Sequence, residues 1–216
     1  MQSKQSRASH GTNGFSMIEL LVVLGIVALL ATISLPYLIN FKKLYKSEDQ
    51  ALKMMDLMRE TAQLALTRRR TMRLEIDLTD NAVLLIDENN SATDTLIKRI
   101  PMESTAEIRV DRLPLTVSKP IPPNYTDIAF ATDAVGHNRG AVSVIGNNVW
   151  AARFRSDGSV VNSANTPINA NIYIWPPITA GNNNPRRTAE VRAITLFGPS
   201  AAIRYWKHDG TTFVAQ

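Results

Sequence analysis

The feature that most constrains this chain is an uncharged apolar segment from Leu20 to Leu35, in which Thr32 and Ser34 carry the polar side chains. Extended back to Phe15, the segment is 21 residues long. An α-helix rises about 1.5 Å per residue, so this length gives roughly 32 Å, enough to cross a hydrocarbon core of about 30 Å. No second segment of this kind follows in the sequence. We therefore expect one membrane-spanning helix.

The rest of the chain has the composition of a folded domain. Of the 216 residues, 44% are hydrophobic and 20% are charged. These values exclude a wholly disordered chain, a collagen and a multispanning membrane protein. The sequence has no cysteine, which excludes disulfide bonds, thiolate metal sites and a cysteine nucleophile. The formal net charge of +5 is too small for this length to name a partner.

The residues before the apolar segment predict its orientation. Residues 1–14 contain Lys4 and Arg7 and no acid, so the positive-inside tendency keeps this end in the cytoplasm. A secretory signal peptide would need a small-residue cleavage site after the apolar segment, and Thr32 to Pro36 offers little of that kind. The segment is therefore expected to remain as an anchor, with the rest of the chain outside.

Glu19 lies inside the apolar segment, one helical turn from its start. A charge at the centre of a membrane helix costs about 2.5 to 3.5 kcal/mol, and less toward the end, so Glu19 is expected to have a partner. Cleavage after Gly14 would supply one, because the new ammonium group on Phe15 would precede Glu19 by four residues.

The segment from Gly14 to Pro36 resembles the processing and assembly signature of type IV prepilins and type II secretion pseudopilins. The resemblance implies that a prepilin peptidase cuts after Gly14 and that Phe15 is then N-methylated. It also implies that Glu19 pairs with the N-terminal ammonium of a neighbouring subunit during assembly. Pro36 stands where the family's proline commonly sits, and we expect it to kink the helix.

The same resemblance implies the domain organisation and the partners. Residues 1–14 are the expected leader peptide, residues 15–36 the transmembrane and assembly helix, and residues 37–216 a periplasmic pilin-like domain. The expected location is the bacterial inner membrane, crossed once. The expected partners are the prepilin peptidase, other pilins or pseudopilins in a filament, an inner-membrane assembly platform and the lipid bilayer.

Beyond Pro36, apolar residues recur at three- and four-residue spacings while charged residues fill the other faces, which predicts an amphipathic helix to about Arg70. We expect this helix to pack against β-sheets through Leu52, Met55, Ala62 and Leu66.

From Thr71 the period changes to alternation, which predicts a β-hairpin from Met72 to Leu78 and from Ala82 to Ile86. Proline- and asparagine-rich stretches predict loops from Pro114 to Asn124 and from Pro176 to Thr188. The fold class is therefore α+β, with a mostly antiparallel C-terminal region. Further strands are expected at 96–100, 107–113, 127–131, 141–145, 149–154, 159–161, 171–175, 191–197, 202–207 and 211–214.

This layout also resembles a narrower group, the H-type minor pseudopilins and related minor pilins, in which a long helix packs on two small β-sheets. The resembling pieces are 62–70, 152–160 and the late hairpin from Ile194 to Tyr205. The sequence departs from the group between Gly198 and Arg204, where relatives tend to carry a second glycine before the final strand.

Two arginine clusters are candidate contacts for DNA. Arg68, Arg69 and Arg70 form the denser one, but cations at a helix C-terminus are favoured by the helix dipole and need no ligand. The better candidate combines Arg186 and Arg187, beside an asparagine-rich loop, with Arg192, because a mobile basic loop can follow phosphates. The solvated interpretation remains the more favoured for both clusters.

Metal binding and catalysis have weaker support. The oxygen-rich group at 87–94 lacks the spacing of an EF-hand, so we expect neither a metal nor another cofactor. His10, His137 and His208 have no partner at metal-binding spacing. The motifs of hydrolases, zinc proteases, phosphate loops and dinucleotide sites are absent from the sequence, which argues against an enzyme. The oxygen-bearing residues of the group at 87–94 are Asp87, Glu88, Asn89, Asn90 and Asp94.

Trp150, Trp175 and Trp206 are expected in the core.

The function that fits these expectations is that of a minor pseudopilin of a type II secretion system, a structural subunit of a short filament that drives protein export. The alternative is a minor pilin of a type IV pilus, involved in pilus priming or DNA uptake. The sequence leaves both open.

Overall fold

The computed structural model describes residues 15–88, 94–120, 125–132, 138–139 and 142–216, without the side chains of 35–44, 138 and 142–143. The chain divides into two compact units, Met1–Phe41 and Lys42–Gln216.

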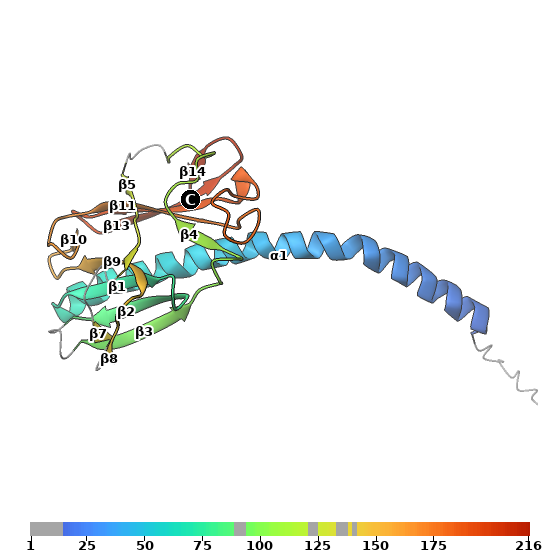
Figure 1. Ribbon diagram of the computed structural model, residues 1–216, viewed down its shortest axis with the longest axis horizontal. Helices are drawn as coiled ribbons and strands as arrows, with labels where there is room; N and C mark the ends of the chain where they lie inside the picture. The colour runs from blue at the N-terminus through green and yellow to red at the C-terminus, as the bar shows by residue number, and fades with distance from the viewer. Residues whose placement is uncertain (1–14, 89–93, 121–124, 133–137, 140–141) are drawn as a thin grey trace, which may run out of the picture. The chain divides into compact units, whose positions relative to one another are not determined.

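One long helix, α1 (Met17–Arg68), is 52 residues long and contributes to both units (Figure 1). The helix continues through Pro36, so the proline does not end it. At the other end, Arg69 has a φ of 53°, and the Arg70 N–H donates to the carbonyl of Ala65. This is the Schellman arrangement, in which a left-handed residue satisfies the last carbonyls of a helix. It ends α1 at Arg68, with three residues before the first strand begins at Met72.

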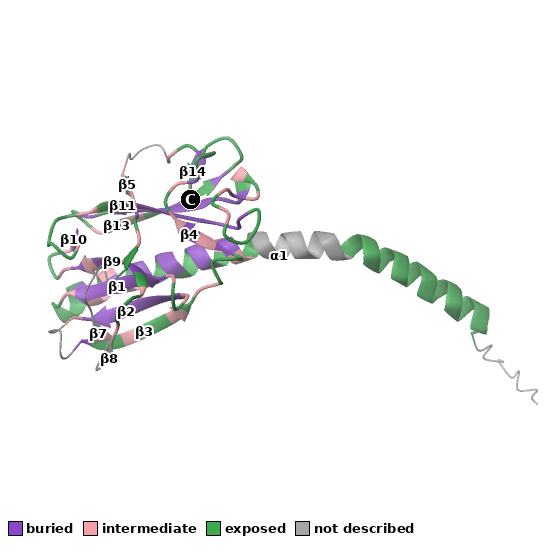
Figure 2. Ribbon diagram, viewed as in Figure 1, coloured by how far each residue is buried: buried purple, intermediate pink, exposed green. Residues whose placement is uncertain are grey.

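The second unit buries one face of α1, formed mainly by methionine, leucine and alanine side chains (Figure 2). Met55 is on this face and Ala62 packs at its margin, as predicted. The prediction was wrong for Leu52 and Leu66, which are 38% and 50% exposed. Leu52 lies one heptad after Tyr45 on the opposite face, whereas Leu66 lies at the margin of the buried face, near Gly158. Because apolar residues are not confined to the buried face, periodicity alone did not separate buried from exposed positions. The buried side chains are Ala51, Met54, Met55, Leu57, Met58 and Ala65.

Two mostly antiparallel sheets form most of the rest of the unit. The first has the order β10-β9-β1-β2-β3, with β6 also pairing β9. Its strands are β1 (Met72–Asp77), β2 (Ala82–Asp87), β3 (Thr95–Pro101), β6 (Ala131–Thr132), β9 (Asn148–Phe154) and β10 (Val160–Val161).

The second sheet has the order β14-β13-β12-β11-β4, and β5 pairs β11 in parallel. Outside both sheets lie the short pair β7 (Asn138–Arg139) and β8 (Val142–Ser143) and the 3-10 turn η1 (Thr188–Glu190). The strands of the second sheet are β4 (Arg109–Asp111), β5 (Thr126–Asp127), β11 (Asn169–Trp175), β12 (Arg192–Phe197), β13 (Ala202–His208) and β14 (Phe213–Ala215).

Both sheets share a core with α1, which confirms the α+β class. One cluster joins Met58 of α1 to Phe154 of the first sheet and Ile172 of the second. The outer face of the second sheet carries a separate cluster that includes Trp175 and Trp206, so these tryptophans are buried as expected. Trp150 is partly buried at the edge of the main core.

Two strand predictions need correction. The expected strand at 127–131 is two short strands, β5 and β6, which belong to different sheets. Thr211 and Thr212 belong to a turn, because their N–H groups donate to Oδ1 of Asp209 at 2.7 and 2.8 Å. The short side-chain-capped turn therefore delays the last strand until Phe213.

Gly198 allows the turn between β12 and β13 to lie directly against another backbone. Its carbonyl accepts a hydrogen bond from the Val160 N–H at 2.6 Å. A Cβ atom at this position would lie 2.1 Å from the carbonyl oxygen of Ile168. Since Val160 belongs to the first sheet and the turn to the second, this close approach ties the two sheets together.

We predict that Gly198→Ala destabilises the folded chain by about 1 to 3 kcal/mol, because the added methyl forces the two backbones apart. The measurement is urea unfolding of the full chain in detergent micelles, followed by tryptophan fluorescence. Ser200→Ala is the matched control, since Ser200 is exposed in the same turn. Equal stability of the two variants would contradict the proposed close contact.

Candidate functional site

The start of α1 is the first candidate site. Phe15 is 81% exposed, the helix begins at Met17, and Glu19 lies in its first turn. Gly14 lies outside the described residues. The backbone N–H of Ser16 donates to Oε2 of Glu19 at 3.4 Å, which is the backward bond of a capping box. An acid in the first turn is also favoured by the helix dipole.

Glu19 therefore has a hydrogen-bond donor within its own chain. The partner expected for Glu19 from the sequence was an ammonium group, and the Ser16 N–H was not predicted. The signal was available, because Ser16 and Glu19 have the Ser-x-x-Glu spacing of a capping box. The contact leaves acceptor capacity on the carboxylate, which has two oxygens and about four lone-pair sites. A further donor can therefore bind Glu19 without displacing Ser16.

The rest of this helical segment presents an apolar surface. All residues from Phe15 to Ser34 are exposed, and Met17–Ser34 is long and apolar enough to cross a membrane. The hydroxyls of Thr32 and Ser34 donate to carbonyls of the same helix at 2.8 and 2.9 Å. Because these polar groups are satisfied internally, they add little cost to burial in lipid.

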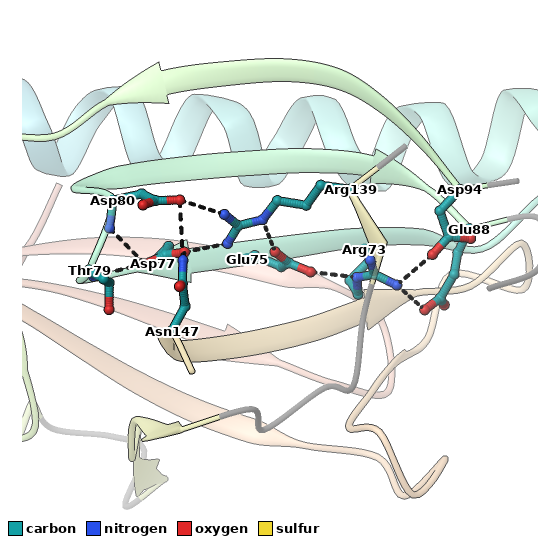
Figure 3. Close-up of polar contacts among 9 residues, drawn as sticks. All are labelled: Arg73, Glu75, Asp77, Thr79, Asp80, Glu88, Asp94, Arg139 and Asn147. Carbon is teal, nitrogen blue, oxygen red and sulfur yellow. Dashed lines mark hydrogen bonds and ion pairs between the residues drawn. The ribbon is translucent and has the colours of Figure 1, made fainter. Parts of the chain in front are cut away.

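The second candidate site is a network of buried charges on the outer face of the first sheet (Figure 3). Arg73, Glu75 and Asp77 alternate along β1 with residues that face the main core, and all three are at most 1% exposed. Arg73 Nε donates to Glu75 at 2.7 Å. Its Nη1 donates to Glu88 at 2.6 Å and to Asp94 at 3.1 Å.

Arg139 of β7 completes the network from a segment distant in sequence. Its Nε donates to Glu75 at 3.1 Å and its Nη1 to Asp80 at 2.7 Å, while Nη2 forms an ion pair with Asp77. Asn147 also donates to Asp77, at 2.7 Å. Figure 3 shows Arg139 reaching across the sheet with its guanidinium among these carboxylates. Three arginine–carboxylate contacts thus hold β7 against β1.

These contacts shift the ionisation of the buried groups. Burial acts to raise the pKa of Asp77, but hydrogen bonds from Arg139, Asn147 and the Asp80 backbone outweigh it and hold the pKa below its ordinary value. Burial acts to lower the pKa of Arg73, yet attraction by Glu75 and Glu88 leaves that pKa raised. Both shifts favour the charged forms of Asp77 and Arg73, so the ion pairs of these two residues hold the segments together near neutral pH.

The oxygen-rich group at 87–94 does not form an open metal site in the described residues. Arg73 occupies the position between Glu88 and Asp94. Asp87 is paired with Arg68 at 3.4 Å and with Arg70 at 3.8 Å, so these arginines belong to an ion-pair cluster at the end of α1. Asn89 and Asn90 lie outside the described residues, and no group of three possible ligands was found among the described ones.

The three arginines proposed for DNA do not form an open basic surface. Arg192 is fully buried and donates to Glu48 of α1 at 3.3 Å. Arg186 is paired with Glu190 at 3.0 Å, whereas Arg187 is exposed.

His208 is also buried. Its Nδ1 accepts a hydrogen bond from the Gly210 N–H at 3.0 Å, which gives it a structural role in the last turn. His10 and His137 lie outside the described residues.

A comparison with known protein families gives a match at the start of α1. Residues 10–35 match the prokaryotic N-terminal methylation motif. No curated protein and no solved structure matches the chain. The motif indicates a protein similar to type IV pilins and pseudopilins, and it implies processing by a prepilin peptidase and assembly with other pilins. The apolar helix fits a single-pass anchor of the type found in such pilins.

We predict that Arg139→Met destabilises the fold by about 3 to 5 kcal/mol at pH 7, because it leaves Asp77 buried without its counter-charge and leaves Glu75 with Arg73 as its remaining partner. The loss should shrink as the pH falls toward 3. The stability that ionised Asp77 gives the wild type is fully present above the unfolded aspartate pKa of about 3.9, and it is lost as the pH falls from there through the lowered pKa of Asp77 in the folded chain.

The measurement is urea unfolding of the full chain in detergent micelles at pH 7 and pH 3. Arg112→Met is the control, because Arg112 is exposed. A loss for Arg139→Met that matches the control, or that does not change with pH, would show that the network is not held by ionic contacts.

Proposed function

We propose that this chain is a minor pseudopilin of a type II secretion system, a structural subunit of the short filament that drives protein export. The observation that carries the proposal is the match of residues 10–35 to the N-terminal methylation motif. The second unit adds support, because a helix packed on two small antiparallel sheets is the layout of the H-type minor pseudopilins that the sequence resembles.

In this proposal the prepilin peptidase cuts after Gly14, and Phe15 becomes the methylated N-terminus. The helix 15–36 holds the subunit in the inner membrane until the assembly platform transfers it to the filament. The ammonium of Phe15 on a neighbouring subunit then pairs with Glu19. Within about 4 Å at low dielectric this attraction is several kcal/mol, although desolvation removes much of it. The remaining acceptor sites on Glu19 suit this second contact.

The residues from Tyr37 onward are placed in the periplasm, because the basic leader is expected to stay in the cytoplasm. The role is structural and not enzymatic. Among the described residues, the network of buried charges that contains Arg73 and Arg139 forms ion pairs that hold the fold together.

The burial and ion pairing of the arginines proposed for DNA favour export over DNA uptake. A protein that binds DNA electrostatically must bring several cations to the phosphates. Arg192 is buried and Arg186 is paired, so Arg187 alone of the three is exposed. A role in type IV pilus priming remains the alternative, because it requires the same helix start and no DNA contact.

We predict that the native membrane protein begins at N-methyl-Phe15. The motivation is that Gly14 and Phe15 precede the apolar segment within the matched motif. Intact-mass and N-terminal peptide mass spectrometry of the protein from its own membrane measures this. A mature chain that begins at Met1, or a cut beyond Pro36, would overturn the pilin-like processing.

We also predict that Glu19→Ala and Glu19→Gln both leave membrane insertion and cleavage intact but reduce incorporation into filaments at least tenfold. Glutamine keeps an acceptor for the Ser16 N–H and loses only the negative charge, so it separates the capping contact from the ion pair. The readout is the amount of each variant in cross-linked filament complexes, in a strain that lacks the wild-type chain.

Normal assembly of Glu19→Gln with failure of Glu19→Ala would assign Glu19 to capping alone. The same deletion strain tests the choice of system: loss of exported proteins from the medium supports secretion, and loss of surface pili supports the alternative.

A further inference from the structure

The first sheet ends in an open edge at β3. Strand β3 pairs with β2, and no described strand pairs with its other side (Figure 1). An edge strand presents a row of backbone N–H and C=O groups that can accept another strand. β3 is seven residues long, and four of its five residues before Ile100 are exposed.

A pocket of about 200 Å³ lies where the end of β3 meets α1. Its apolar lining includes the buried side chains of Met54 and Val83, with Ile100 of β3 beside them. A cavity of about 150 Å³ already holds a benzene molecule, so this one admits an aliphatic side chain. Methionine lining adapts readily to different shapes.

The helix and the edge strand run side by side here. Lys98 of β3 donates to Glu60 of α1 at 2.6 Å. The pocket is lined both by Ile100 and by helix residues that lie about one to three turns before Glu60. A strand added to β3 would therefore extend along α1, with one of its inward side chains at the pocket. Two independent features, the edge of β3 that no described strand pairs with and the pocket, thus favour the same kind of ligand.

Charge indicates which strand would bind. β3 contains Lys98 and Arg99 and no acid. Lys98 is paired with Glu60, whereas Arg99 is exposed and donates to the backbone carbonyl of Asp80 at 3.1 Å. Pairing of two copies of β3 would place like charges opposite one another, which is destabilising. An acidic strand from a different protein would instead face Arg99 with the opposite charge.

We propose that the β3 edge binds an extended acidic segment of a partner protein by strand addition, with one aliphatic side chain of that segment in the pocket beside Met54 and Ile100. Backbone hydrogen bonds supply the affinity, and the pocket and Arg99 supply the specificity. This goes beyond the proposed function, because it does not depend on the filament that the chain joins.

The test uses labelled seven-residue peptides of alternating valine and glutamate with a leucine at one end or the other, both ends capped. Their binding to the full chain in detergent micelles is followed by fluorescence anisotropy up to millimolar protein. We expect saturable binding of at least one peptide. N-methylation of one alternate set of its amides should abolish binding, and methylation of the other set should not, because an added strand uses only one set.

Two variants of the chain complete the test. Arg99→Glu should weaken binding about tenfold, since it replaces an attraction across the strand pair by a repulsion. Arg112→Glu, an equal charge change at an exposed position after β4 in the other sheet, should leave binding unchanged. Circular dichroism confirms that both variants are folded.

Three outcomes would overturn the proposal. They are no saturable binding, equal binding of both N-methylated peptides, and equal weakening by the two charge variants. Self-association of the wild-type chain through β3 would also overturn it, by naming a second copy as the partner.

Discussion

The second unit depends on the packing of one face of α1 against both sheets. Met54, Leu57 and Met58 lie in a single buried cluster with side chains from each sheet. Full burial of such a side chain contributes roughly 1.5 to 3 kcal/mol, so several on one helix face supply much of the stability of a domain. The small residues Ala51 and Ala65 on the same face let the helix lie close to the strands.

Polar contacts then specify how the remaining segments attach to this core. Glu48 of α1 pairs with the buried Arg192 of the second sheet, and Arg139 joins β7 to three carboxylates on and beside β1. Buried ion pairs add little net stability compared with apolar packing, but loss of one partner is costly. Such pairs therefore select one arrangement over others. Most arginines of the two candidate DNA-binding clusters form ion pairs within the fold, so they do not form an open basic surface.

The helix start obeys a different constraint, because its exposed apolar surface fits a membrane anchor. Thr32 and Ser34 satisfy their hydroxyls within α1, and Glu19 accepts the Ser16 N–H. A carboxylate with a donor in its own chain is less costly to insert than an unpaired one. The same group keeps lone pairs for a second donor, which the proposed assembly contact would use.

The sequence by itself determined the features that depend on neighbouring residues. The apolar segment, the methylation motif, the helix to Arg68 and the β1–β2 hairpin all follow from local composition and period. Only the tertiary structure decided which face of α1 is buried, because apolar residues such as Leu52 and Leu66 occupy exposed positions as well. The tertiary structure also decided two long-range contacts. Arg192 binds Glu48, 144 positions away, and Arg139 binds Glu75, 64 positions away. Alternation along β1 marks Arg73 and Glu75 as one polar face, but nothing local shows that distant segments cover it.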